Sequence, residues 1–92
     1  MKEVTIDFSN IQSDEELHFL LKTKLNFPEY YGMNWDAFWD SITGLVEMPD
    51  RLQVTGWRHL RKTLPSDSGI FLSLLLDYND QPDLKTIQVD IK

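Results

Sequence analysis

The sequence predicts an α/β fold of two layers, in which about four helices pack against a small three-stranded parallel sheet. Apolar and polar residues alternate with the period of a strand along residues 3–8, 52–55 and 86–91. Helical patterns separate these segments, and strands joined through helical crossovers are typical of a parallel sheet. Because each expected strand has one polar face, we expect helices on only one side of the sheet, although parallel sheets are usually buried on both.

The first crossover is expected to contain two helices. Ser13 and Glu16 have the spacing of a capping box, followed by leucines at helical intervals. A loop over residues 28–33 leads to a second helical pattern, which begins near Asn34. That helix should end at Gly44 or shortly after it, because glycine readily adopts the conformation that terminates a helix.

The second crossover is also expected to contain two helices. Residues 57–64 predict a short helix that Pro65 stops, since proline cannot continue a helix from within. A further helix should follow with its apolar residues between 70 and 75. Either Asp67 or Ser68 is expected to cap it, because both residue types favour the N-terminal cap.

Length, charge and cysteine content restrict the classes of function. Ninety-two residues predict a single domain over 1–92, and the absence of cysteine excludes disulfides, thiol catalysis and thiolate metal sites. The net charge of −6 disfavours nucleic-acid binding, which needs cations, although alone it indicates only solubility. With no apolar segment of membrane-spanning length, and residues 1–8 unlike a signal peptide, we expect a cytoplasmic protein without membrane contact.

Acidic and aromatic residues are concentrated in one region of the chain. Residues 25–50 contain no lysine or arginine, and six aromatic residues lie between 27 and 39. The acidic residues of this region are Glu29, Asp36, Asp40, Glu47 and Asp50. Residues 51–64 reverse the sign, with Arg51, Arg58, Arg61 and Lys62 and no acid. The two charge types are therefore segregated along the sequence.

The helix expected after Asn34 divides into two faces. Its apolar stripe, expected to lie in the core, consists of Trp35, Phe38, Ile42 and Leu45. Its second face consists of Asp36, Asp40, Thr43 and Glu47, with Trp39 at the border. Like charges four residues apart destabilise a helix by about 0.2–0.5 kcal/mol, and no cation at helical spacing relieves them.

The acidic face is either a solvated stripe or a binding surface. The tyrosines at 30 and 31 and Trp39 cannot all be buried in so small a chain, which favours a binding surface. Exposed aromatic residues beside charged anchors are typical of binding hot spots. This combination predicts a basic, arginine-rich partner.

Carboxylates could also hydrolyse glycosides or bind a divalent cation. Hydrolysis needs a cleft and one carboxyl group with a raised pKa, and a single helix face offers no obvious cleft. Asp36, Asp40 and Glu47 cover about three helical turns, too far apart to chelate a cation without further ligands. His18 and His59 lack motif partners and are interpreted as partly exposed structural residues. We expect no catalytic residues, no metal site and no cofactor.

One motif connects these observations to a known family. Residues 28–40 read PEYYGMNWDAFWD, and Thr43 and Gly44 follow shortly after. This dense pattern strongly resembles the barstar family of bacterial ribonuclease inhibitors. The resemblance implies a barstar-like fold, a small parallel sheet packed with helices. It also implies a protein that binds a secreted microbial ribonuclease inside the producing cell and blocks its active site.

The resemblance further implies a binding surface, residue by residue. The matched positions are Tyr30, Asn34, Asp36, Trp39, Asp40, Thr43 and Gly44. Asp40 would mimic an RNA phosphate and reach the basic residues of the enzyme, with Asp36 reinforcing it and Tyr30 and Trp39 in apolar contact. Leu45 stands where barstar has an aromatic interface residue, and Asp77 corresponds most nearly to a late contact acid. The role of Asp80 and the identity of the target stay open.

The residues and the resemblance together predict a cytoplasmic inhibitor that is not an enzyme. It would neutralise a basic, extracellular-type (barnase-like) ribonuclease, be a monomer when free, and bind no nucleic acid. The alternative is a barstar-like immunity or interaction protein whose basic target is not a ribonuclease. A carboxylate enzyme is the weakest possibility, and assays for inhibition, binding and turnover separate the three.

Overall fold

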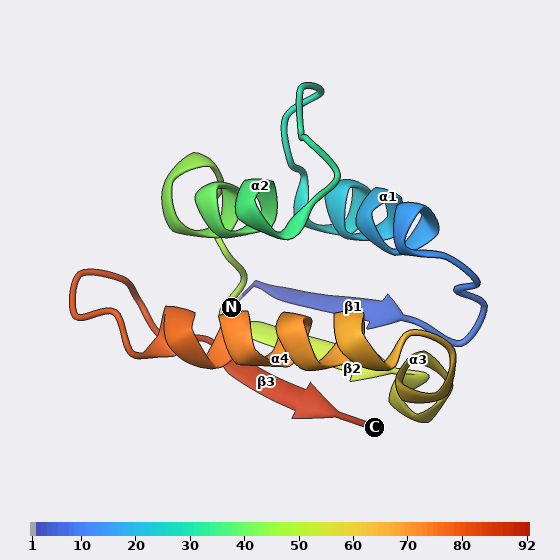
Figure 1. Ribbon diagram of the computed structural model, residues 1–92. Helices are drawn as coiled ribbons and strands as arrows, with labels where there is room; N and C mark the ends of the chain where they lie inside the picture. Colours follow the sequence, from blue (N-terminus) through green and yellow to red (C-terminus); the bar gives the residue numbers. More distant parts are fainter. Residues whose placement is uncertain (1) are drawn as a thin grey trace.

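The computed structural model describes residues 2–92 and confirms the predicted α/β fold (Figure 1). Along the chain, the elements are β1 (Glu3–Asp7), α1 (Asp14–Leu25), α2 (Trp35–Asp40), the π-helical turn η1 (Ser41–Leu45), β2 (Arg51–Thr55), α3 (Trp57–Thr63), α4 (Pro65–Asn79) and β3 (Gln88–Ile91). Within the described residues, no helix is long and apolar enough to cross a membrane.

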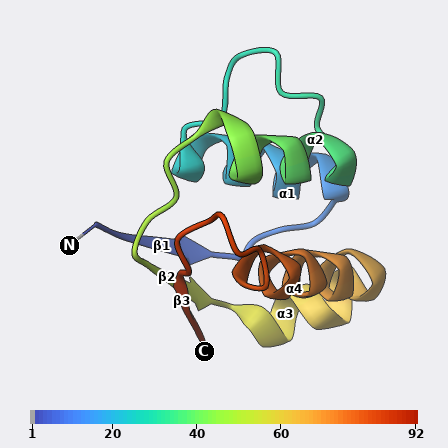
Figure 2. The same cartoon turned by 90° about the vertical axis from the view of Figure 1, so that its left-hand side faces the viewer.

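The three strands form a parallel sheet in the order β1-β2-β3. Ile6 lies beside Val54 in the register, and both side chains are fully buried on the inner face together with Leu52. Helices α1 to α4 all lie on this side of the sheet, as Figure 2 shows. The alternation seen in the sequence therefore reflects a sheet with one covered face.

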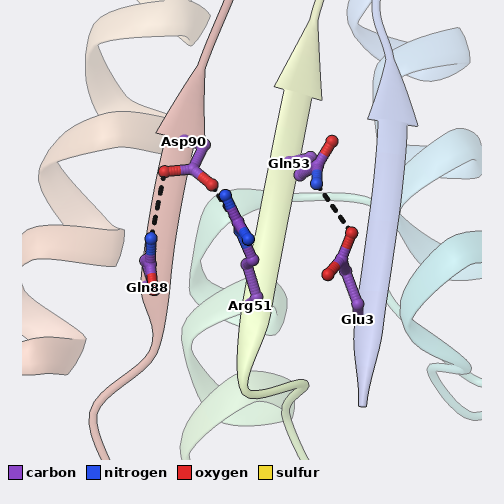
Figure 3. Close-up of polar contacts among 5 residues, drawn as sticks. All are labelled: Glu3, Arg51, Gln53, Gln88 and Asp90. Carbon is purple, nitrogen blue, oxygen red and sulfur yellow. Dashed lines mark hydrogen bonds and ion pairs between the residues drawn. The ribbon is translucent and has the colours of Figure 1, made fainter. Parts of the chain in front are cut away.

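The opposite face of the sheet carries polar side chains that contact one another across the strands (Figure 3). Arg51 Nε donates to Asp90 Oδ2 over 2.5 Å, joining β2 to β3. On the other side of β2, Gln53 Nε2 donates to Glu3 Oε1 over 2.6 Å. Because these groups bond to each other in place of an apolar layer, the face needs no covering helix.

The core lies between the inner face of the sheet and the helices. Phe8, Phe38 and Phe71 are among its largest fully buried side chains. The ring of Phe71, from α4, packs edge-on against Phe8 with 5.4 Å between centroids, and it lies 5.9 Å from Phe38 of α2. The edge-on arrangement of Phe8 and Phe71 is one that aromatic pairs prefer, and the contact between Phe38 and Phe71 joins α2 to α4.

The N-terminus of α1 confirms the predicted capping box. The Ser13 hydroxyl accepts a hydrogen bond from the Glu16 backbone N–H over 3.2 Å. The Glu16 carboxylate reaches back and accepts from the backbone N–H of Gln12 over 3.1 Å. Both bonds satisfy donors near the helix start.

The predicted start of α4 is wrong. The helix begins at Pro65, and neither Asp67 nor Ser68 is its cap. Proline is favoured in the first helical turn because its missing N–H would have no partner there. The Ser68 hydroxyl donates to the Pro65 carbonyl oxygen over 2.9 Å, and Asp67 accepts a bond from Trp35 of α2. Asp67 is therefore used for a tertiary contact rather than for a cap.

Candidate functional site

The loop before α2 is held by the side chain of Asn34. Its Oδ1 accepts from the Ala37 backbone N–H over 2.7 Å, which caps α2, and its Nδ2 donates to the Gly32 carbonyl oxygen over 3.2 Å. Asparagine is a preferred N-cap because its side chain satisfies a free N–H of the first turn. One side chain thus fixes both the end of the loop and the start of the helix.

Tyr31 joins the same loop to helix α1. Its hydroxyl oxygen lies 2.7 Å from His18 Nδ1 of α1, and the hydroxyl donates to the Asn34 carbonyl oxygen over 3.3 Å. The expectation of a partly exposed His18 is wrong, because only 2% of its surface is exposed. Burial lowers the pKa of His18, with Asp67 and Asp14 opposing that change, and burial raises the pKa of Tyr31. His59 is partly buried.

Tyr30 has the opposite orientation to its neighbour. Its side chain is 76% exposed, whereas Tyr31 is buried. The prediction that these aromatic residues cannot all be buried is therefore confirmed. Tyr30 is available for contact with a partner because Tyr31 holds the loop in place.

An open groove separates α2 from α4, and four carboxylates surround it. Its volume is about 880 Å³. The residues that line it are Trp35, Asp36, Trp39, Asp40, Ile70, Leu74, Asp77, Asp80 and Gln81. The four aspartates are exposed, and none belongs to the ion pairs found in residues 2–92, which join Lys22 to Glu29, Arg51 to Asp90 and Lys85 to Asp50. We call this surface the acidic groove.

Helix α4 supplies the half of the acidic groove that the sequence left uncertain. Asp77 and Asp80 lie near the C-terminal end of α4, which passes beside α2 (Figure 1). The structure brings both residues to the groove that Asp36 and Asp40 line from the other side. Sequence analysis missed Ile70 and Leu74 as groove residues. Ile70 and Leu74 are four residues apart, and Asp77 follows Leu74 by three, so the sequence could have placed all three on one face of a helix.

The predicted core stripe is wrong at Leu45. Phe38 and Ile42 are buried, but Leu45 is 51% exposed. The cause is η1, in which the Val46 N–H bonds to the Ser41 carbonyl oxygen five residues earlier. Such a turn holds more residues than an α-helical turn, so side chains along it, including its last residue Leu45, fall behind the helical phase. Leu45 therefore turns away from the core.

Leu45 instead borders a second, smaller hollow on the far side of α2. That hollow measures about 270 Å³, and Tyr30, Gly32, Asp40 and Leu45 are among its lining residues. Asp40 lines both this hollow and the acidic groove. Its carboxylate thus lies at the junction of two concave surfaces, one acidic and one apolar.

The two tryptophans of α2 are both partly buried. Trp39 was expected to be partly exposed. Trp35 was expected in the core, but it is only partly buried and packs against the core from its edge. Its Nε1 donates to Asp67 Oδ1 over 2.8 Å, and its ring packs edge-on against His18 at 4.4 Å. The indole of Trp35 needs a position at the core boundary, where its N–H can reach this acceptor.

The chain is similar in sequence to proteins of one known family. A family model described as barstar (barnase inhibitor) matches residues 1–92. The chain belongs to the barstar family. A protein of Bacillus subtilis (strain 168) named "Putative ribonuclease inhibitor YrdF" is 49% identical over 81 residues, which cover 88% of this chain and 89% of that protein. The resemblance to the barstar family drawn from the sequence is confirmed.

The remaining positions implied by the barstar family lie outside the two hollows. Asn34 is occupied with capping α2, and the Thr43 hydroxyl donates to the Trp39 carbonyl oxygen over 2.7 Å. Gly44 is exposed, and a Cβ built on it would meet nothing within 4 Å. The structure therefore gathers Tyr30, Asp36, Trp39, Asp40, Leu45 and Asp77 around α2, while Asn34 and Thr43 form its backbone supports.

The exposed carboxylates around α2 determine what the groove can bind. In residues 2–92, no group of three or more histidine, aspartate and glutamate side chains is placed to coordinate one. The groove does offer exposed negative charge above an apolar floor. That combination suits a cationic side chain, whose charge meets the carboxylates while its stem lies on apolar surface.

Proposed function

We propose that this member of the barstar family inhibits a secreted, barnase-like ribonuclease inside the cytoplasm of the producing cell. The observation that carries the proposal is the position of Asp40, exposed at the junction of the acidic groove and the Tyr30–Leu45 hollow. A ribonuclease active site is built to bind RNA phosphates, so it presents cations. A carboxylate raised between two concave surfaces is the complementary group.

Each part of the surface has a distinct role in this proposal. Asp40 enters the active site and takes the place of a phosphate, with Asp36 beside it and Asp77 facing both across the groove. Trp39 contributes apolar contact within the groove, and Tyr30 and Leu45 do so in the hollow. The inhibitor thus blocks the enzyme by occupying its substrate site, without performing chemistry of its own.

Replacing the Asp40 carboxylate tests the proposal, with barnase as the probe. We expect Asp40→Asn to weaken binding by about 2–5 kcal/mol, or about 30-fold to 4,000-fold in Kd, because the enzyme's cations lose their partner. That range was established in part on complexes of barstar itself. The folding stability should be unchanged or slightly higher, because one like-charge pair is removed.

Asp83→Asn is the matched control. Asp83 is exposed in the segment after α4 and does not line the acidic groove, so the same chemical change there should leave inhibition intact. If Asp40→Asn inhibits barnase as well as the parent chain does, Asp40 is not the phosphate mimic. A parent chain that binds a basic protein stably without inhibiting any ribonuclease would favour the non-ribonuclease alternative, and RNA turnover by the purified chain would contradict both.

A further inference from the structure

A second charged surface, of opposite sign, lies on α3. It surrounds a hollow of about 480 Å³ lined by Trp57, Arg58, Arg61, Lys62, Ile91 and Lys92. The spacing of three and four residues places Arg58, Arg61 and Lys62 on one side of α3. The four cationic residues are exposed. We call this surface the α3 patch.

The α3 patch is only slightly neutralised within residues 2–92, because Asp90 is close enough to attract Lys92 and no carboxylate forms an ion pair with the three cations of α3. The ion pairs in residues 2–92 use Lys22, Arg51 and Lys85, none of which belongs to it. Residues 51–64 contain no acid, so α3 has no carboxylate of its own to offset these charges. Clustered like charges repel one another, so the electrostatic free energy of the patch falls when an acidic surface covers it.

The acidic groove is the complementary surface on the same molecule. It presents four carboxylates and the apolar side chains Trp39, Ile70 and Leu74, while the α3 patch presents four cations around Trp57 and Ile91. The two surfaces match in sign, in number of charges and in having an apolar centre. Helices α2 and α3 lie at opposite corners of the fold, so one molecule cannot bring its own two surfaces together (Figures 1 and 2).

We propose that the α3 patch of one molecule binds the acidic groove of a second copy. Because different surfaces meet, the contact is head-to-tail, and the pair keeps one free groove and one free patch for further copies. The net charge of −6 opposes the approach of a polyanion and of a second copy alike, so the second copy is favoured because its groove matches the patch in number of charges and in its apolar centre.

This contact has a consequence for inhibition, which rests on the proposed function. The groove that receives the α3 patch is the groove that would receive the ribonuclease. The ribonuclease and the α3 patch of a second copy therefore compete for one groove. Because the enzyme binds more tightly, it dissociates the self-associated chain. Self-association itself requires no ribonuclease, so it can be tested alone.

Two complementary variants test the contact by sedimentation velocity. Arg58→Glu with Arg61→Glu changes the sign of two of the four patch charges and leaves the patch with no net charge (the patch-reversed variant). Asp77→Lys with Asp80→Lys does the same to the four charges of the groove. At about 10 mM ionic strength, where charges act over about 30 Å, the parent chain should grow beyond a dimer as its concentration rises. Each variant alone should stay monomeric. Their mixture should stop at a one-to-one dimer, because only one intact groove and one intact patch remain to meet.

Matched charge changes elsewhere keep this experiment specific. Lys2→Glu with Lys24→Glu alters the net charge equally at exposed residues outside the patch, and this variant should still associate. Raising the ionic strength to about 150 mM should weaken the parent association by about tenfold or more. The patch-reversed variant should inhibit barnase like the parent, which separates failure of this contact from failure of the proposed function.

Three results would overturn the proposal. The first is a parent chain that remains monomeric at low salt up to millimolar concentration. The second is equal loss of association in the patch-reversed and control variants, which would show a general charge effect. The third is a monomeric parent chain that binds a fluorescent oligouridylate through the patch, since the patch would then serve a nucleic acid.

Discussion

The hydrogen bond between Trp35 and Asp67 predicts different roles for the two tryptophans of α2. Trp35→Phe removes the Nε1–H that donates to Asp67 Oδ1 over 2.8 Å and leaves a partly buried carboxylate without this donor. A hydrogen bond to a charged group contributes about 1.5–3 kcal/mol. For a domain of this size, each kcal/mol lowers the melting temperature by about 4–8 °C. We therefore expect Trp35→Phe to unfold at a clearly lower temperature than the parent.

Trp39→Phe should show the reverse pattern. Its indole N–H makes no hydrogen bond within residues 2–92, and the ring lines the acidic groove, so the loss of stability should stay below about 1.5 kcal/mol. Its inhibition of barnase should weaken more than that of Trp35→Phe, because an interface tryptophan leaves water mainly on binding. Denaturant titration and inhibition assays on both variants measure the two effects separately.

A double-mutant cycle isolates the bond itself. If Trp35 and Asp67 stabilise the fold through each other, then Trp35→Phe and Asp67→Ala together should destabilise by less than the sum of the two single changes, with a coupling of about 1–3 kcal/mol. Asp67→Asn keeps an acceptor oxygen and should be milder than Asp67→Ala. Additive losses would refute the reasoning. So would a Trp35→Phe variant that folds normally but inhibits poorly, because the two faces of α2 would then be wrongly assigned.

Three further results are expected. The buried His18 binds a proton less readily in the folded than in the unfolded chain, so the free energy of unfolding should fall as the pH drops below about 6.5. His18→Gln should make the free energy of unfolding less dependent on pH. If the pH dependence is unchanged in this variant, other groups cause it. Gly56→Ala should destabilise the fold by at least about 1–2 kcal/mol, because Gly56 has φ of +69° and an added Cβ would collide with the backbone of Ser9. A normal melting curve would contradict this. Added salt should slow association with barnase and barely change dissociation in stopped-flow experiments, whereas an association rate indifferent to salt would exclude steering by the acidic groove.

The fold was predictable where one local rule decided each element. The period of two in β1, β2 and β3 was visible because one face of the sheet is polar. The capping box at Ser13 and the helix start near Asn34 were visible because the signals for a helix start are local in sequence. The start of α4 was not, because Asp67 resembles a cap and only the folded chain shows its bond to Trp35. Tertiary contact overrode a correct local preference.

The candidate site was predictable as a segment but not as a surface. The acids and aromatics of residues 27–40 marked α2 and its loop, whereas the half of the groove on α4 depends on how two distant helices pack. The exposure of Leu45 depends on η1, and a π-helical turn changes the phase of the helix without a clear signal in composition. His18 looked unremarkable because its partner, Tyr31, comes from another element.

The uncovered face of the sheet offers a place for chemical attachment. Thr5 is exposed there, between Glu3 and Asp7 on β1, and the chain contains no cysteine. Thr5→Cys would therefore introduce a unique thiol on the side of the molecule away from the helices. A dye or a biotin linked to it would report on binding, or fix the protein to a sensor chip, while the acidic groove and the α3 patch both stay open to solution.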